Sequence, residues 1–236
     1  MFYNEYCMDA RKELILNTII KEHIKSGIPV GSSILVEKYK LDISPATVRN
    51  EMSSLEEEGY IIQPHTSAGR VPTEKAYCLY LDNLKSKKLG QSESQDLEDV
   101  LKQGDEVGFK EAAKIIANIS GNTVFWAFHR HNLYYTGISN LLQQPEFSQI
   151  NLIYDISSII DRIDEIVDKV FPETKLGRHV LVGSKNPFGN LFGSILVKYQ
   201  LEDDIGLFGI VGPIRMDYEK NIAIADFINE KLRLKN

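Results

Sequence analysis

Two stretches of this sequence gather side chains that can bind a polyanion. In the first, QPHTSAGRVPT (residues 63–73), His65 and Arg70 flank small and hydroxyl residues, and no carboxylate occurs although the chain has a net charge of -6. Cations, hydroxyls and backbone amides donate hydrogen bonds to phosphates, and Gly69 allows close approach of a backbone. If the polyanion is DNA, we expect His65 and Arg70 to contact phosphate groups, or Arg70 to enter the minor groove. The structural alternative is an ordinary polar turn in which Arg70 pairs with Glu74.

The second stretch, SPATVRNEMSSLEEEG, runs from Ser44 to Gly59. Its apolar residues have the spacing i, i+4, i+7 of a buried helical stripe: Val48, Met52 and Leu55. The opposite face presents Ala46, Asn50 and Ser53, and it is flanked by Thr47, Arg49 and Ser54. All six side chains are short and uncharged or, in Arg49, cationic. Asparagine pairs with adenine and arginine with guanine through two hydrogen bonds each, whereas the glutamates at positions 56–58 would be repelled by phosphates. The N-terminal half of this helix is therefore expected to face DNA, unless Ser44 is only a helix cap and the glutamates only a solvated face.

The elements around these stretches follow the order of a winged helix. The patterning predicts three helices in succession: one over residues 9–26 that ends at Gly27, a short one over 34–39 capped by serines, and the one that begins at Pro45. A strand over 60–63 and a return strand around Arg70-Val71 follow. A fourth helix, capped by Thr73, comes after them. In such a module the third helix enters the major groove and the hairpin touches the flanking backbone. The candidate DNA-binding residues are Ser32, Ser33, Ser44, Ala46, Thr47, Arg49, Asn50, Ser53, His65, Thr66, Ser67, Gly69 and Arg70.

Composition and charge limit the class of protein and the part of the chain that can contact a polyanion. A chain of 236 residues with 43% apolar residues can bury a core, and its two cysteines form no metal-binding pattern. The start of the chain lacks the pattern of a signal peptide, and no apolar run is long enough to span a membrane, so a cytoplasmic protein is expected. Residues 1–88 carry 12 basic and 12 acidic side chains, and the rest carry 15 and 21. Contact with a polyanion is therefore expected in the first part of the chain.

The chain is expected to divide into a DNA-binding domain over residues 1–85, a polar linker over 86–105, and an α+β domain over 106–236. The predicted elements of the last domain include helices over 106–119 and 157–170, a final helix capped by Asp217, and mainly antiparallel strands in TVFWAF, RHVLVG, GSILVKYQL and GLFGIVG. The TVFWAF segment is apolar on both faces, which is typical of a central strand.

We find little catalytic chemistry in this second domain. His129-Arg130-His131 has spacing that could suit a metal, but no further ligand supports it, and a surface turn is the better interpretation. The glycines of VGSKNPFGN lack the spacing of a phosphate-binding loop. Neither a metal nor another cofactor is expected, and enzymatic activity is not expected.

The first part of the chain resembles the DNA-binding region of the HrcA family of bacterial heat-inducible transcription repressors. The resemblance is carried by the stretch LDISPATVRNEMSSLEEEGYIIQPHTSAGRVPTEKAY. The likeness runs from about Arg11 to Asp82 and returns at TGISNLLQQPEF (136–147) and GIVGPIRMDYEKNIAI (209–224). The resemblance implies a winged helix-turn-helix domain followed by a GAF-like domain, and a homodimer that represses chaperone genes from an inverted repeat. It also implies the chaperonin as a partner that helps to keep the repressor active.

One feature departs from the family. Relatives usually carry an inserted dimerisation element before the TGxSNLL region, whereas here NTVFWAFHRHNLYYTGISNLL continues without it, which puts the mode of dimerisation and the coupling to the chaperonin in question. Two alternatives remain open: a winged-helix regulator controlled by a small metabolite in the GAF-like domain, and a winged helix used for contact with another protein. The uncharged face around Asn50 and the acid-free hairpin count against the second alternative.

Overall fold

The computed structural model describes residues 8–40, 42–85, 87–129, 131–147, 150–201 and 204–233. The chain divides into two compact units, unit 1 (Met1–Asn83) and unit 2 (Leu84–Asn236), which are described separately.

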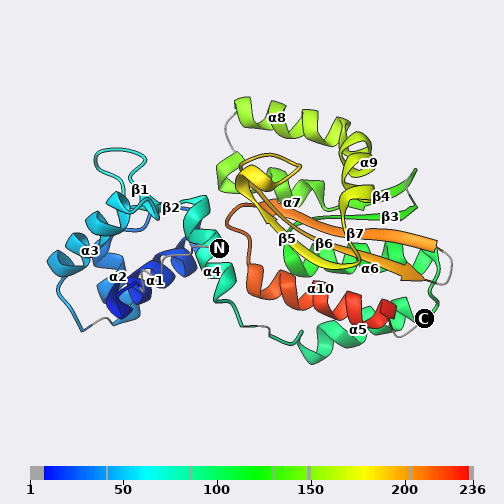
Figure 1. The fold of residues 1–236 in the computed structure, drawn as a ribbon, viewed down its shortest axis with the longest axis horizontal. Coiled ribbons are helices and arrows are strands. Elements are labelled where there is room, and N and C mark those ends of the chain that lie inside the picture. The colour runs from blue at the N-terminus through cyan, green and yellow to red at the C-terminus, as the bar shows by residue number, and fades with distance from the viewer. Residues whose placement is uncertain are drawn as a thin grey trace, which may run out of the picture. The chain divides into compact units, whose positions relative to one another are not determined.

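Unit 1 contains three helices, a short hairpin and a fourth helix (Figure 1). The elements are α1 (Ala10–Ser26), α2 (Ser32–Tyr39), α3 (Pro45–Glu57), β1 (Ile61–Ile62), β2 (Val71–Pro72) and α4 (Glu74–Asp82). This order agrees with the prediction from patterning. The core consists of apolar side chains from all four helices, including Ile15, Ile19, Leu35, Val48, Leu55 and Tyr77.

Local signals explain where these helices begin and end. Gly27 follows α1 with φ of 68°, in the left-handed region that favours glycine. Ser44 caps α3 by accepting a hydrogen bond from the Thr47 amide, and Thr73 caps α4 through the Ala76 amide. The prediction for α2 was wrong in detail, because Gly31 is its N-cap and Ser32 and Ser33 form its first turn.

Unit 2 is built on a five-stranded sheet with the strand order β4-β3-β7-β6-β5, in which every pairing is antiparallel. The strands are β3 (Thr123–His129), β4 (Asn132–Thr136), β5 (Gly177–Val182), β6 (Phe192–Leu201) and β7 (Asp204–Pro213). As the apolar pattern of TVFWAF predicted, β3 is a central strand. Strand β3 pairs with β7, and Phe125 of β3 lies opposite Gly209 of β7. The Phe125 ring occupies the space that a side chain at Gly209 would need, so this position requires glycine.

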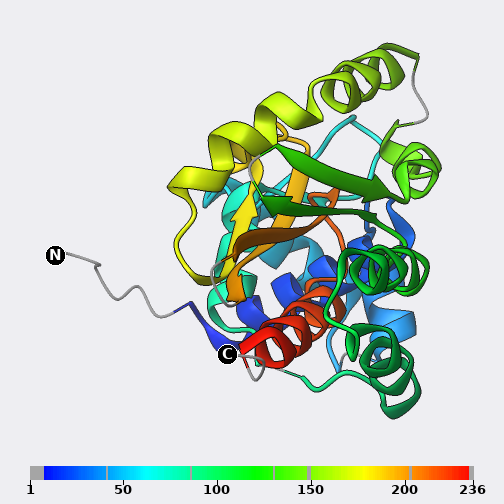
Figure 2. The same ribbon diagram turned by 90° about the vertical axis from the view of Figure 1, so that its right-hand side faces the viewer.

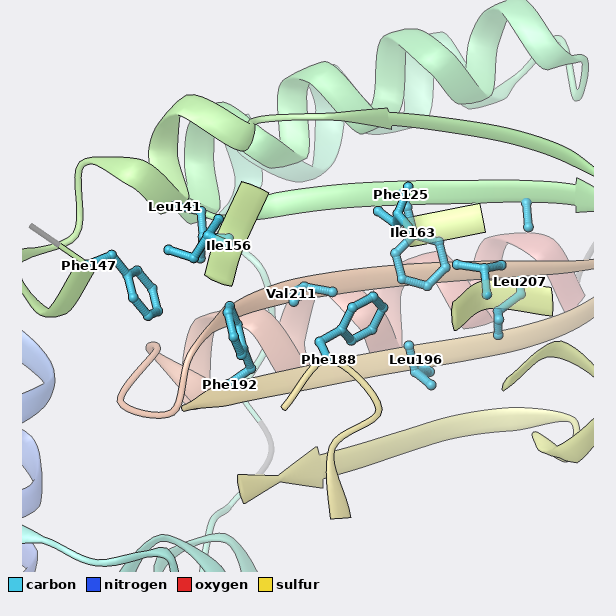
Figure 3. Close-up of a cluster of buried hydrophobic side chains, with 12 residues drawn as sticks. Phe125, Leu141, Phe147, Ile156, Ile163, Phe188, Phe192, Leu196, Leu207 and Val211 are labelled. Carbon is cyan, nitrogen blue, oxygen red and sulfur yellow. The ribbon is translucent and has the colours of Figure 1, made fainter. Parts of the chain in front are cut away.

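Helices cover both faces of this sheet (Figures 1 and 2). One face packs against α6 (Glu106–Ser120) and α10 (Tyr218–Arg233), where Phe109 stacks on Trp126 with 4.8 Å between ring centroids. The other face carries an apolar cluster beneath α7 (Ile138–Leu142), the 3-10 turn η1 (Pro145–Phe147), α8 (Ile150–Asp161) and α9 (Ile163–Glu173). Phe125, Phe188 and Phe192 lie in this cluster (Figure 3).

Two predicted boundaries in unit 2 differ from the structure. Residues 91–101, assigned to the linker, form α5 (Gln91–Leu101), which packs on α6 through the buried side chains of Leu97 and Leu101. The helix expected over 157–170 is two helices, α8 and α9, with the break at Arg162. The apolar spacing continues across this break, so periodicity alone could not reveal it.

Candidate nucleic-acid interface

The exposed face of α3 is set by what its other face buries. Val48, Met52 and Leu55 are buried as predicted, in a helix that packs on α1 and α2. Burial of this stripe leaves the side chains of Ala46, Arg49, Asn50 and Ser53 exposed on the opposite side. The two longest of these, Arg49 and Asn50, are side chains that can reach base edges or phosphates.

Some hydroxyl groups on α3 are engaged within the helix. The Ser53 hydroxyl donates to the Arg49 carbonyl at 3.1 Å, and Ser44 accepts from the Thr47 amide at 3.1 Å. The Ser44 and Thr47 hydroxyl oxygens lie 2.9 Å apart. These three side chains therefore stabilise the start and turns of α3, in addition to any contact they make outside it.

The hairpin loop (residues 63–70) joins β1 to β2 and is stabilised by its own first side chain. The Gln63 amide nitrogen Nε2 donates to the Thr66 carbonyl at 3.0 Å and to the Ala68 carbonyl at 2.9 Å. The Ala68 amide donates to the His65 carbonyl at 2.8 Å. This role of Gln63 was not predicted from the sequence, although a glutamine at the start of a short polar loop can form such bonds. The side chains of His65, Thr66 and Ser67 remain exposed.

Arg70 anchors the far end of the hairpin loop. Its Nε lies 2.8 Å from the Glu56 carboxylate on α3. The structural alternative had named Glu74 as the partner of Arg70. Its backbone pairs with Val30, with an Arg70 N to Val30 O distance of 2.8 Å and a Val30 N to Arg70 O distance of 2.9 Å. The Arg70 side chain is only 16% exposed. Any contact of Arg70 with phosphate must therefore use the outer guanidinium nitrogens.

Gly69 is explained by packing inside unit 1. A Cβ atom at this position would lie 2.4 Å from the Val30 carbonyl carbon and 2.5 Å from its oxygen. Both atoms belong to the backbone and cannot move aside easily. Glycine is thus needed for the loop to approach the turn before α2, which differs from the expected close approach to DNA.

A groove of about 430 Å³ lies between the start of α2, α3 and the hairpin loop. It contains no carboxylate among its lining residues, which are Gly31, Ser32, Ser33, Arg49, Met52, Gln63, Thr66, Ser67, Ala68, Gly69 and Arg70. Seven of the thirteen candidate DNA-binding residues line it: Ser32, Ser33, Arg49, Thr66, Ser67, Gly69 and Arg70. The structure does not bring the other six to the groove: Ser44, Ala46, Thr47, Asn50, Ser53 and His65. Ser32 is buried, which restricts it to contacts at the groove floor.

The glutamates at the end of α3 are more than a solvated face. Glu56 pairs with Arg70, and Glu58 pairs with the Lys12 ammonium of α1. The hydrogen bond from Lys12 lowers the pKa of Glu58. Two of the three carboxylates thus connect α3 to neighbouring elements of unit 1, and their charge is partly neutralised by cations.

The two sequence segments of unit 2 that carry the family likeness meet in the fold. Arg215, which follows β7 and is buried, donates through Nη2 to Gln144 at 2.8 Å and to Glu146 at 2.9 Å. Asn140 donates to the carbonyls of Ala117 and Asn122. These bonds connect α7 and η1 to α6 and to the residues that flank β3 and β7, which is a structural role for Asn140, Gln144 and Arg215.

Unit 2 also has a cavity of about 540 Å³ beside the end of α9. Val170, Leu181 and Leu196 form its apolar part, and Lys175 and Lys185 are among its polar lining residues. Elsewhere in the unit, His131 Nδ1 lies 3.6 Å from the Asp168 carboxylate. Across the described part of the chain there is no group of three or more side chains able to hold a metal ion. None of the helices formed by the described residues has the length and apolar character needed to cross a bilayer.

The family model and the similar proteins found by sequence comparison all point to one family. The family model described as "HrcA protein C terminal domain" matches residues 76–222. The protein is 25% identical to the heat-inducible transcription repressor HrcA of Desulforamulus reducens, over 95% of this chain and 96% of the relative. It is 27% identical to the HrcA of Natranaerobius thermophilus, over 96% of each chain, and 50% identical to that of Acidothermus cellulolyticus over 40% of this chain and 28% of the relative.

The alignment with the Desulforamulus protein extends over 336 positions, more than the 236 residues of this chain. Gaps must therefore open in this sequence, as expected for a chain that lacks a segment its relatives carry. A solved structure described as a hypothetical protein has the same fold, with a TM-score of 0.76 over 97% of this chain and 98% of that chain, at 19% sequence identity.

Proposed function

The chain belongs to the HrcA family of heat-inducible transcription repressors, and on this premise we propose that it binds operator DNA through unit 1. In this proposal unit 1 is a winged helix, α3 is the recognition helix and the hairpin loop is the wing. Unit 2 acts as a GAF-like domain that pairs two copies. Operator binding then blocks transcription, and membership of a repressor family accounts for the function without enzymatic activity.

The observation that supports this function most strongly is the acid-free groove between α3 and the hairpin loop. Arg49 and Arg70 are its two cations, and hydroxyls and backbone amides supply the other donors. Because unit 1 carries 9 basic and 12 acidic side chains, general attraction to DNA is weak and the local arrangement of donors must provide the affinity. Asn50 does not line the groove, but it follows the groove-lining Arg49 in the sequence and is exposed on α3, where it can read a base edge in the major groove.

The proposed complex is a homodimer on an inverted repeat in the cytoplasm, because one winged helix covers only a half-site and a twofold dimer matches a twofold operator. The chaperonin is the proposed partner that couples repression to the load of misfolded protein. The chain runs from β3 through β4 to α7 without the family's inserted segment, so coupling to the chaperonin is measured separately from operator binding.

Selection from random-sequence duplexes provides a test of both. The full chain should enrich a sequence with twofold symmetry, and purified chaperonin should raise the fraction of active repressor on the selected duplex. Enrichment of no sequence would contradict operator recognition. A selected duplex whose binding is unaffected by chaperonin would contradict only the coupling.

The cavity in unit 2 favours a second candidate function, in which a small ligand controls the repressor. Its volume of about 540 Å³ lies within the range of small-molecule sites. Its apolar part lies beside two lysines and one carboxylate, Glu173, so the cations outnumber the acid and suit an anion with an apolar body. Thermal unfolding with benzoate and with inorganic phosphate should show stabilisation of the wild type but not of a Lys175→Glu, Lys185→Glu variant. Equal shifts in both proteins would argue against this candidate.

A further inference from the structure

We propose that Glu56, a carboxylate beside the proposed DNA-binding face, is a positioning residue that sets the hairpin loop against α3. The proposal rests on the function proposed above and adds a residue to it. Glu56 was grouped with two other glutamates as unfavourable to phosphate. The structure gives it a separate role, because its side chain bonds to both ends of the hairpin loop.

Each oxygen of the Glu56 carboxylate bonds to a different arm of the hairpin. Oε1 accepts a hydrogen bond from the Gln63 backbone amide at 2.9 Å, and Oε2 lies 2.8 Å from Arg70 Nε. Gln63 is the residue directly after β1, and Arg70 is the residue directly before β2. One side chain on α3 thus holds the two residues from which the loop departs.

The hairpin needs these bonds from Glu56 because its own strands are short. The strands pair Ile61 with Pro72 and Ile62 with Val71, and proline has no amide hydrogen to donate. At the base of the hairpin the Thr73 amide donates to the Tyr60 carbonyl at 2.9 Å. A two-stranded hairpin of this size is at best marginally stable by itself. The loop is therefore fixed from outside the hairpin, by Glu56 on one side and by the Val30 backbone on the other.

The charge of Glu56 makes the proposal testable, because repulsion and positioning predict opposite changes in DNA affinity when Glu56 is neutralised. An acidic side chain near DNA repels phosphates, so its neutralisation should strengthen binding if repulsion is all that it does. If Glu56 instead positions the loop, neutralisation should weaken binding, because glutamine offers a single acceptor oxygen to two donors. Glu57 is the matched control, since it is the next residue on α3 and its side chain is exposed.

The experiment uses the full chain and a duplex selected by the wild type. Glu56→Gln should weaken binding to that duplex about 10-fold, the scale expected for loss of a charged hydrogen bond, whereas Glu57→Gln should bind as tightly as the wild type or more tightly. Hydroxyl-radical footprints should lose protection of the flanking backbone in Glu56→Gln and retain protection in the centre of each half-site.

Glu56→Asp separates geometry from charge. It retains the negative charge, but its shorter side chain cannot reach both Gln63 and Arg70, so it should lose the flanking protection as Glu56→Gln does. A double-mutant cycle with Arg70→Gln should show coupling, because the ion pair can be lost only once. Melting temperatures of the variants identify any that fail to fold, and in that case Glu56→Asp provides the comparison.

The outcomes distinguish the two proposals. A wild-type chain that binds no selected duplex contradicts the proposed function. A wild type that binds, with Glu56→Gln and Glu57→Gln equally tight and both footprints complete, overturns the positioning role of Glu56. Weaker binding by Glu56→Gln and Glu56→Asp, with flanking protection lost and Glu57→Gln unaffected, supports it.

Discussion

Asn50 is the side chain on α3 best suited to read a base. It is exposed in the N-terminal half of the helix, away from the glutamates at the C-terminal end. Replacement by alanine should cost about 1–3 kcal/mol of binding free energy on the selected operator, because two hydrogen bonds to one base are lost, and little on random DNA. Titration of both duplexes at a fixed salt concentration measures this difference. An equal loss on both would show that Asn50 does not read a base.

Arg49 offers the complementary case, a cation that lines the groove. If it neutralises one phosphate, Arg49→Ala should weaken binding to operator and random DNA alike and lower the slope of log affinity against log salt by about one. Binding measured over a range of salt concentrations gives the slope. Lys40 is an exposed cation that follows α2 as its C-cap, and Lys40→Ala is a control that should leave the slope closer to that of the wild type.

Residue-level predictions succeeded where they depended on neighbours along the chain. The buried stripe of α3 follows from helical spacing, and the caps at Ser44 and Thr73 follow from residues three positions apart. The partner of Arg70 could not be predicted in this way. Glu74 is the closer carboxylate in sequence, but the fold brings Glu56 to Arg70 from 14 residues away.

At the scale of elements, α1 and α2 are joined through the buried carboxylate of Glu22. It accepts hydrogen bonds from Lys38 at 2.7 Å and from the Tyr39 hydroxyl at 2.9 Å. The bond from Lys38 lowers the pKa of Glu22, while burial, followed by the bond to Glu22, raises the pKa of Tyr39 to about 12. A carboxylate with a lowered pKa stabilises the fold above its unfolded-state pKa, and this contribution is lost as the pH falls through its folded-state pKa.

Glu22→Gln should therefore lower the free energy of unfolding by roughly 1–3 kcal/mol near pH 7, because a buried charged hydrogen bond is lost. The difference from the wild type should shrink in acid, as the wild-type carboxyl becomes protonated. Urea unfolding at about pH 7 and about pH 3 measures both effects, with the exposed Glu37→Gln on α2 as control. A difference that stays constant with pH would contradict a role for the charge.

Element types were predictable from the sequence, but some boundaries were not. The order of helices and strands in unit 1 and the inner position of β3 in its sheet followed from apolar patterning. Helix α5 was missed because its sequence is polar apart from a few positions, and because Leu97 and Leu101 are buried by packing on other helices, α6 and α10. In this segment tertiary contact outweighs the composition that suggested a linker.

At the scale of the whole molecule, the balance of charge limits what a single copy can do. Residues 1–88 sum to zero charge, and the remainder carries the whole net charge of -6. A single unit 1 therefore has few cations to release counterions from DNA, and it can cover only one half-site. Tight binding at physiological salt requires a second copy, because linking two binding modules can raise the overall affinity by about 10²–10⁴.

The full chain should accordingly be a dimer, with unit 2 as the pairing domain, whereas a fragment of residues 1–85 should be monomeric. The fragment should bind the whole operator at least about 100-fold more weakly than the full chain, yet bind a half-site about as well as it binds the whole. Sedimentation of both proteins, followed by titration on whole and half operators, measures these quantities. A full chain that is monomeric and still binds the whole operator tightly would overturn this view, because no linked second copy would then account for the affinity.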